Sequence, residues 1–309
     1  MSRVNAVKCG VATAVVAVFL AALPAPAGAQ QVLLGSLGGA HAGADDGGAL
    51  VRIDQTTGAA TVIGTPVPGY GLPGLAVNSA GQVYAVTSDT DGAGAYPRLI
   101  TVDPTNGALL STVGNLTYLG NPGVALADLA FQPGTGVLFG VARGDQGLSF
   151  NDIVTVNTST AEVTLIGSPN TNGDGGYLAI AFAPDGTFYA KETNAGGFWT
   201  LDPTNAQVLT SMTLNPAEGG LGLAVRPSDG VLFMSECCNT TLGNDIYTVD
   251  GATGAATLLG SAGGTRRVQD LDFYTPAAAI PAATHSGLAA LALLIAALAV
   301  WVLVTRRTA

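Results

Sequence analysis

The sequence predicts an all-β protein: a β-propeller of five four-stranded blades, closed by its N-terminal strand and followed by one C-terminal transmembrane helix. Three observations predict it. A strand-like landmark recurs at intervals of 45 to 54 residues, the two ends of the repeat region complement each other, and an apolar run lies near the C-terminus. The 43 Gly and 16 Pro among 309 residues also suit a protein with many short strands and turns.

Residues 1–29 have the pattern of a secretory signal peptide. Arg3 and Lys8 precede an apolar run over residues 11–23, and Ala27-Gly28-Ala29 supplies small residues for cleavage. We therefore expect the mature chain to begin near Gln30 and to be exported.

Residues 30–276 carry the repeat. A four-residue landmark that ends in Asp or Asn occurs at residues 51–54, 100–103, 154–157, 199–202 and 247–250. A turn and a second apolar run follow each landmark, which indicates a hairpin. A second pair of short strands begins at residues 75–77, 129–131, 180–182 and 223–225. Four short strands per repeat predict one propeller blade.

The two ends of this region are complementary half-blades. Val32-Leu33-Leu34 matches the second strand of a repeat, and Leu271-Asp272-Phe273 matches the first. A ring can complete its last blade by pairing these two strands, which removes both exposed edges. We therefore expect five blades over residues 31–276.

The C-terminal segment has the pattern of a membrane anchor. After a linker over residues 277–287, the 17 uncharged residues 288–304 reach about 25 Å as a helix, close to the roughly 30 Å core of a bilayer. The basic tail over residues 305–309 is expected in the cytoplasm by the positive-inside rule. The domain before the helix is then extracytoplasmic.

Ile280, Pro281, Gly287, the apolar span and the Arg306-Arg307 pair together resemble a C-terminal sorting signal of the IPTL type (IPTL-CTERM), which is related to the PEP-CTERM signals of exported bacterial proteins. This resemblance implies processing by a membrane transpeptidase of the exosortase class. It also implies release of the domain to the cell surface or the medium.

The repeats resemble those of exported bacterial β-propellers. The resemblance rests on motifs such as residues 183–190, Ala-Pro-Asp-Gly-Thr-Phe-Tyr-Ala, and residues 102–107, Val-Asp-Pro-Thr-Asn-Gly. It implies the fold and leaves the activity open, because propellers include binding proteins, hydrolases, lactonases and quinoproteins.

Four carboxylates are the candidate metal ligands. Aligning the second strands places Glu192 and Glu236 at one position in neighbouring blades, while Asp128 and Asp270 directly precede two inner strands. Converging carboxylates suit a hard cation such as Ca²⁺. In the alternative interpretation, the Asp side chains accept hydrogen bonds from backbone N–H groups and the Glu side chains are solvated. The longer loops follow these Glu positions, so we expect any site on that face of the ring.

Cys237 and Cys238 are the only cysteines of the mature domain and are adjacent in sequence. In an oxidising compartment they form a strained vicinal disulfide, remain inert thiols, or take a redox or intermolecular role. The sequence leaves these three alternatives open.

Charge narrows the choice of partners. The domain contains all 21 acidic residues but only 7 of the 11 basic ones, so its net charge is −14. This excludes nucleic acid as a partner and leaves cations, basic proteins and uncharged glycans. Its single His, His41, lies in a Gly-rich loop and is not expected to serve a catalytic triad.

The sequence thus predicts an exported, non-catalytic propeller that acts as a binding or structural module of the cell envelope or matrix, with an unknown protein or glycan ligand. The alternative is a metal-dependent hydrolase or lactonase with a cation, such as Ca²⁺, held at the mouth of the channel by the four carboxylates.

The tail alone is expected to hold the protein in the membrane, because residues 30–276 contain no uninterrupted apolar span. A chain truncated after Thr275 should be recovered in the soluble fraction after signal removal, whereas the full-length chain should sediment with membranes. Sedimentation of the truncated chain would contradict this prediction.

Overall fold

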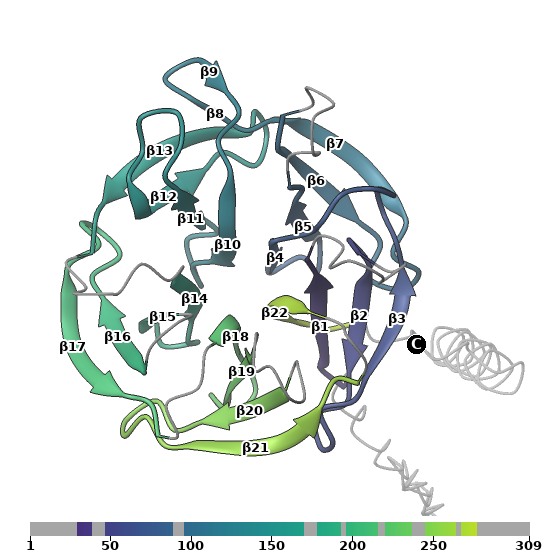
Figure 1. Ribbon diagram of the computed structural model, residues 1–309, viewed down its shortest axis with the longest axis vertical. Coiled ribbons are helices and arrows are strands. Elements are labelled where there is room, and N and C mark those ends of the chain that lie inside the picture. Colours follow the sequence, from purple (N-terminus) through teal and green to yellow (C-terminus); the bar gives the residue numbers. More distant parts are fainter. Residues whose placement is uncertain are drawn as a thin grey trace, which may run out of the picture.

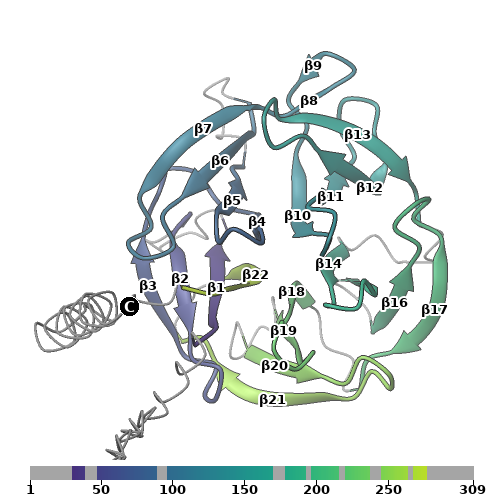
Figure 2. The same ribbon diagram turned by 180° about the vertical axis from the view of Figure 1, so that it is seen from behind.

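The computed structural model describes residues 30–38, 47–88, 96–169, 178–192, 196–215, 220–236, 245–263 and 267–276. These residues form strands, turns and bends and contain no helix. Figures 1 and 2 show five sheets arranged radially in a ring. The predicted five-bladed propeller is therefore confirmed.

Each blade contains four strands in the order inner, second, third and outer, and one blade has two further strands beyond its outer strand. The inner strands are β4 (Gly74–Val77), β10 (Leu126–Phe131), β14 (Leu178–Phe182), β18 (Gly220–Val225) and β22 (Val268–Tyr274). The second strands are β1 (Val32–Leu37), β5 (Val83–Val86), β11 (Leu138–Arg143), β15 (Phe188–Glu192) and β19 (Leu232–Glu236).

The outer half of each blade is a hairpin. The third strands are β2 (Leu50–Ile53), β6 (Arg98–Val102), β12 (Phe150–Val156), β16 (Gly197–Leu201) and β20 (Asp245–Val249). The outer strands are β3 (Ala60–Gly64), β7 (Leu109–Asn115), β13 (Glu162–Gly167), β17 (Val208–Thr213) and β21 (Ala256–Ser261).

The inner strands surround the axis of the ring. Each contacts the inner strand of the next blade, in the order β22, β4, β10, β14, β18 and back to β22. The apolar core consequently lies between blades: Phe139 of one blade packs on Phe182 and Phe188 of the next, whose rings stack with their centroids 4.2 Å apart. Alternation of apolar residues along the strands supplies these contacts.

Closure by the N-terminal strand is confirmed. β1 pairs with β2 on one side and with β22 on the other, in a register that sets Leu33 opposite Phe273 and Leu34 opposite Asp272. The first and last strands of the domain thus share one sheet, and β22 has no free edge on that side.

The residue that ends each landmark caps the turn after it. Asp54 Oδ1 accepts hydrogen bonds from the N–H groups of Thr56 at 2.8 Å and Thr57 at 3.0 Å. These bonds, with that of the Thr56 hydroxyl, favour the charged carboxylate and lower the pKa of Asp54 to about 2. The equivalent side chains accept from the N–H two residues on: Asp103, Asn157, Asp202 and Asp250. The recurring Asp or Asn residue therefore stabilises a turn.

One blade is larger than expected. Between the outer strand β7 and the next inner strand β10, the chain forms β8 (Thr117–Tyr118) and β9 (Asn121–Pro122). The two strands form a tight hairpin, which Gly120 permits with a φ of 79°, and β8 pairs in parallel with β13. This sheet therefore has six strands.

The expected signal peptide (1–29), the linker (277–287) and the apolar span (288–304) with its basic tail lie outside the described residues, as do Ile280, Pro281, Gly287, Arg306 and Arg307. Within the segments that the structure describes, no helix is long and apolar enough to cross a membrane.

Deleting residues 31–37 should destabilise the ring, because it exposes both β22 and β2 as unpaired edges. We expect the melting temperature to fall by several degrees or the protein to aggregate, measured by thermal denaturation against the chain truncated after Thr275. An unchanged melting temperature would mean that the pairing of β1 with β22 is dispensable.

Candidate functional site

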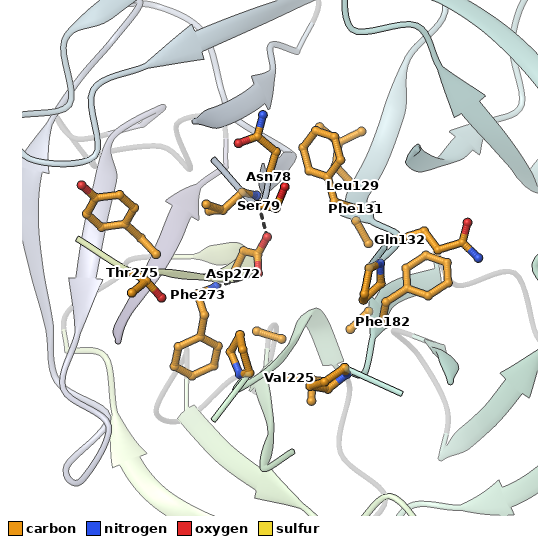
Figure 3. A pocket seen from close by; sticks show the side chains of 18 of the residues that line it. Asn78, Ser79, Leu129, Phe131, Gln132, Phe182, Val225, Asp272, Phe273 and Thr275 are labelled. Atoms are coloured by element: carbon orange, nitrogen blue, oxygen red, sulfur yellow. Dashed lines mark hydrogen bonds between the residues drawn. The ribbon is translucent and has the colours of Figure 1, made fainter. Parts of the chain in front are cut away.

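The centre of the ring contains a cavity of about 920 Å³ (Figure 3). Residues from the ends of all five inner strands line it, together with the turns that lead into the second strands. The cavity therefore lies at the end of the channel where the short turns are.

This position differs from the expected one. We expected any site on the face of the long loops, but the cavity lies at the opposite end of the inner strands. The turns there, such as residues 78–82, are short. The long loops lie largely outside the described residues, which omit 39–46, 89–95 and 170–177.

The described lining of the cavity is mainly apolar and carries a single charged group. Phe131, Phe182 and Phe273 come from three different blades, and Figure 3 shows them around the same space. The polar side chains of the lining are Asn78, Ser79, Gln132, Thr135, Tyr274 and Thr275. Among the described lining residues, Asp272 is the only one with a charge.

Asp272 is held in place by two backbone N–H groups. Its Oδ2 accepts a hydrogen bond from Val77 of β4, in the next blade, and its Oδ1 accepts one from Phe273, both at 2.6 Å. Burial among apolar side chains outweighs these two bonds and raises the pKa of Asp272 to about 7. Asp272 is half-buried as a residue, and Figure 3 shows its side chain among those that line the cavity.

Sequence reasoning missed Asp272, although a signal was present. The pairing register makes Asp272 equivalent to Ala76, Ala130, Ala181 and Ala224, which lie at the middle of the same motif in the other four blades. A carboxyl at a position otherwise occupied by Ala is a departure that a column-by-column comparison of the repeats detects.

Asp128 and Asp270 were predicted to converge, and the structure brings them together. Both side chains are fully buried, and their carboxyl groups are hydrogen-bonded to each other. The N–H of Leu129 donates to both, at 2.6 Å to Asp128 Oδ1 and at 3.4 Å to Asp270 Oδ2.

Each of these two carboxyls also bonds to the inner strand of the next blade. Asp128 Oδ2 accepts from the N–H of Ile180 in β14 at 2.8 Å, and Asp270 Oδ2 accepts from Leu75 in β4 at 2.6 Å. An inner strand has no pairing partner on its channel side, so a carboxyl there satisfies an otherwise unpaired donor. These contacts match the interpretation in which the Asp side chains accept backbone hydrogen bonds.

Burial has a strong effect on the protonation of this pair. Desolvation raises the pKa of Asp128 to about 8, and desolvation together with the charge of Asp128 raises the pKa of Asp270 well above its usual range. At neutral pH the pair therefore retains a proton, which the hydrogen bond between the two carboxyls requires.

The neighbouring blades make room for the pair with glycine. A Cβ added to Gly222 would lie 2.6 Å from Asp270 Cα, and one added to Gly74 would lie 3.2 Å from the carbonyl carbon of Asp128. The absence of a side chain at Gly222 and Gly74 therefore leaves space for the backbone of Asp270 and Asp128.

Glu192 and Glu236 end their strands and are buried, not solvated. Glu236 Oε2 accepts a hydrogen bond from the Tyr247 hydroxyl at 3.3 Å, while Glu192 Oε1 is buried with no hydrogen-bond partner among the described residues. Beside them, Lys191 is fully buried and donates to the backbone carbonyl of Glu192.

The described segments contain no group of three or more His, Cys, Asp or Glu side chains arranged to hold a metal ion. The loops that follow Glu192 and Glu236 lie outside the described residues, and so do Cys237 and Cys238. The Ca²⁺ site and the vicinal disulfide stay predictions.

A comparison with protein families supports the repeated character of the sequence. Residues 121–271 match a family model described as "Repeat of unknown function (DUF6923)". The matched segment extends from β9 to β22. No curated protein matches the sequence.

Several solved structures are similar at low identity. A protein of unknown function from Bacteroides caccae is 13% identical with a TM-score of 0.47, over 79% of this chain and 99% of that one. Glutaminyl cyclase from Myxococcus xanthus is 14% identical with a TM-score of 0.40, over 66% and 71% of the two chains.

Hydrazine synthase from Kuenenia stuttgartiensis is 14% identical with a TM-score of 0.39, and the match covers 64% of this chain. The chain spans 50% of the length of that synthase chain. At these identities and TM-scores the likenesses carry no inference about activity.

The buried carboxyls predict that stability falls as pH rises. Because the pKa values of Asp128, Asp270 and Asp272 are raised in the folded state, the unfolded chain releases their protons first. The free energy of unfolding should therefore decrease from about pH 5 to about pH 8, by at most about 1.4 kcal/mol per pH unit for each titrating carboxyl. Thermal denaturation across this range measures the slope.

The Asp270→Asn variant lacks one of these three titrating carboxyls. Its melting temperature should therefore depend less on pH than that of the wild type, whatever its absolute value. A wild-type melting temperature that is constant or rises from pH 5 to pH 8 would contradict the raised pKa values of these carboxyls in the folded state.

Proposed function

We propose that this protein is an exported β-propeller that acts as a non-catalytic binding module of the cell envelope or extracellular matrix, with the central cavity as its ligand site. The observation that carries the proposal is the cavity itself. Its volume of about 920 Å³ lies within the range of small-molecule sites, roughly 300–1,000 Å³. Its walls are largely apolar, with a few polar groups, as is usual for such sites.

The described chemistry of the cavity favours binding over catalysis. The described lining has hydroxyl groups on Ser79, Thr135, Tyr274 and Thr275, and all of these residues except Tyr274 are exposed. Nucleophilic catalysis needs a hydroxyl or thiol in contact with a base. The described lining includes no His, Lys or Cys, and its one carboxyl, Asp272, accepts hydrogen bonds from the backbone N–H groups of Val77 and Phe273. Asp128 and Asp270 do not belong to the described lining of the cavity, and they bond to backbone N–H groups and to each other.

The sequence at the two ends supports the proposed location. A signal peptide directs the chain out of the cytoplasm, and the apolar span over residues 288–304 tethers it to the membrane with the domain outside. The sorting-signal resemblance at Ile280, Pro281, Gly287, Arg306 and Arg307 adds an exosortase-class transpeptidase as the partner that releases the domain. The hydrolase or lactonase alternative stays a prediction that no described contact favours.

Narrowing the mouth of the cavity should abolish binding. Ala80→Trp combined with Thr135→Trp places two large side chains on exposed lining residues, so the fold should be unaffected. The full-length protein is incubated with a small-molecule extract of the producing cells' envelope and medium, and retained compounds are identified by mass spectrometry. We expect at least a tenfold loss of the compounds that the wild type retains.

Leu209→Trp is the matched control, because Leu209 is 64% exposed on the outer strand β17, away from the cavity. It should retain the same compounds as the wild type. Equal retention by the Ala80→Trp/Thr135→Trp double variant (the rim variant), or conversion of a retained compound to a product, would contradict the proposed function.

A further inference from the structure

The chemistry of Asp272 restricts what the cavity can bind, and this inference rests on the proposed function because it concerns the same site. Asp272 is the only charged side chain among the described lining residues, and Figure 3 shows this side chain at the cavity. The hydrogen bonds that it accepts from Val77 and Phe273 come from neutral backbone N–H groups. The described wall therefore supplies a negative group without a matching positive one.

The blade itself does not require a carboxyl at this position. The four equivalent residues are Ala, and their strands form the same inner ladders: Ala76 opposite Tyr84, Ala130 opposite Phe139, Ala181 opposite Tyr189 and Ala224 opposite Phe233. The link from β22 to β4 also exists without Asp272, because Asp270 already accepts a hydrogen bond from Leu75. Asp272 adds a second bond across this boundary, from Val77, but the other four inner strands pack against their neighbours with Ala at the equivalent position. The fold therefore does not by itself require a carboxyl there.

Asp272 retains acceptor capacity for a ligand. A carboxylate offers about four acceptor positions on its two oxygens, and the backbone bonds from Val77 and Phe273 use one position on each. A donor in the cavity can therefore bond to Asp272 without displacing either N–H. A charged donor would form the stronger bond, because charge-assisted hydrogen bonds are about twice as strong as neutral ones.

The remaining wall suits the rest of such a ligand. Phe131, Phe182 and Phe273 line the cavity, and aromatic rings attract cations as well as apolar groups. The net charge of −14 over the domain raises the local concentration of cations and repels anions. The charge of the carboxylate, the aromatic lining and the overall charge all favour the same kind of ligand.

We propose that the cavity binds an organic monocation, a primary ammonium group carried on an aromatic or apolar body, with Asp272 anchoring the ammonium. The body lies against the phenylalanine rings, and an anionic compound of the same shape is excluded.

Three compounds of similar shape test this proposal: phenethylamine, 2-phenylethanol and phenylacetate, which are cationic, neutral and anionic. Their affinities for the full-length protein are measured by ligand-observed NMR at pH 8, above the pKa of about 7 of Asp272. We expect phenethylamine to bind at least tenfold more tightly than 2-phenylethanol, and phenylacetate to bind most weakly.

Asp272→Ala is the decisive variant, since Ala is the residue of the other four blades. It should bind phenethylamine and 2-phenylethanol within about twofold of each other, with the affinity for 2-phenylethanol unchanged. Glu162→Ala removes the same charge from an exposed residue of β13 and should keep the wild-type preference. Asp272→Asn, which preserves the shape of the side chain, should behave like Asp272→Ala; this distinguishes loss of charge from loss of structure.

The outcomes separate this inference from the proposed function. Equal binding of phenethylamine and 2-phenylethanol by the wild type overturns the ammonium site but leaves a ligand cavity in place. A preference for phenethylamine that survives in Asp272→Ala also overturns it. If none of the three compounds binds, the inference fails, while the rim variant still decides whether the cavity binds any ligand.

Discussion

The pairing of β1 with β22 is the contact on which the rest of the molecule depends. It joins strands more than 230 residues apart, and it converts a row of five blades into a ring in which every inner strand has two neighbours. The entropic cost of closing such a long loop grows only slowly with its length. Without this closure, β22 would have a free edge, and its contact with β4 would lack the support of a complete blade. The central cavity exists only in the closed ring, because all five blades line it.

Closure creates a second requirement, which the buried acids meet. The channel side of each inner strand is a sheet edge, so some of its N–H groups have no partner within the blade. Asp128 satisfies Ile180, and Asp270 satisfies Leu75, in each case across the boundary to the next blade. Two ionised carboxylates in contact inside the protein would be costly. The proton retained by the pair lowers this cost and lets the two groups bond to each other.

The sequence predicted the elements that repeat and missed those that depend on side-chain direction. The five landmarks suffice to predict the number of blades, because they are a local pattern that recurs. The two ends suffice to predict the closure, because each matches one strand of that repeat. The structure brings Asp128 and Asp270 together, two of the four carboxylates that were candidate metal ligands. Sequence spacing does not reveal whether a carboxyl faces a loop, a metal or an N–H group. Any site was expected on the face of the long loops, because loop length was the only signal of a site that the sequence offered, whereas the cavity of the described residues lies at the face of the short turns. Asp272 was treated as part of a strand pattern, although the four alanines at its position marked it as different.

In a symmetric repeat protein, a residue that breaks the symmetry is informative about function. Equivalent positions experience similar packing, so Ala at four of them shows what the fold alone requires. Asp272 breaks this pattern in the blade that the two ends of the chain build together, opposite Leu34 of β1. A ligand held by Asp272 and by rings from other blades contacts the closing strand and its neighbours at once. Such a ligand binds only the closed ring, so its binding free energy adds to the stability of closure. Ligand recognition and ring closure are therefore thermodynamically linked through one strand, β22.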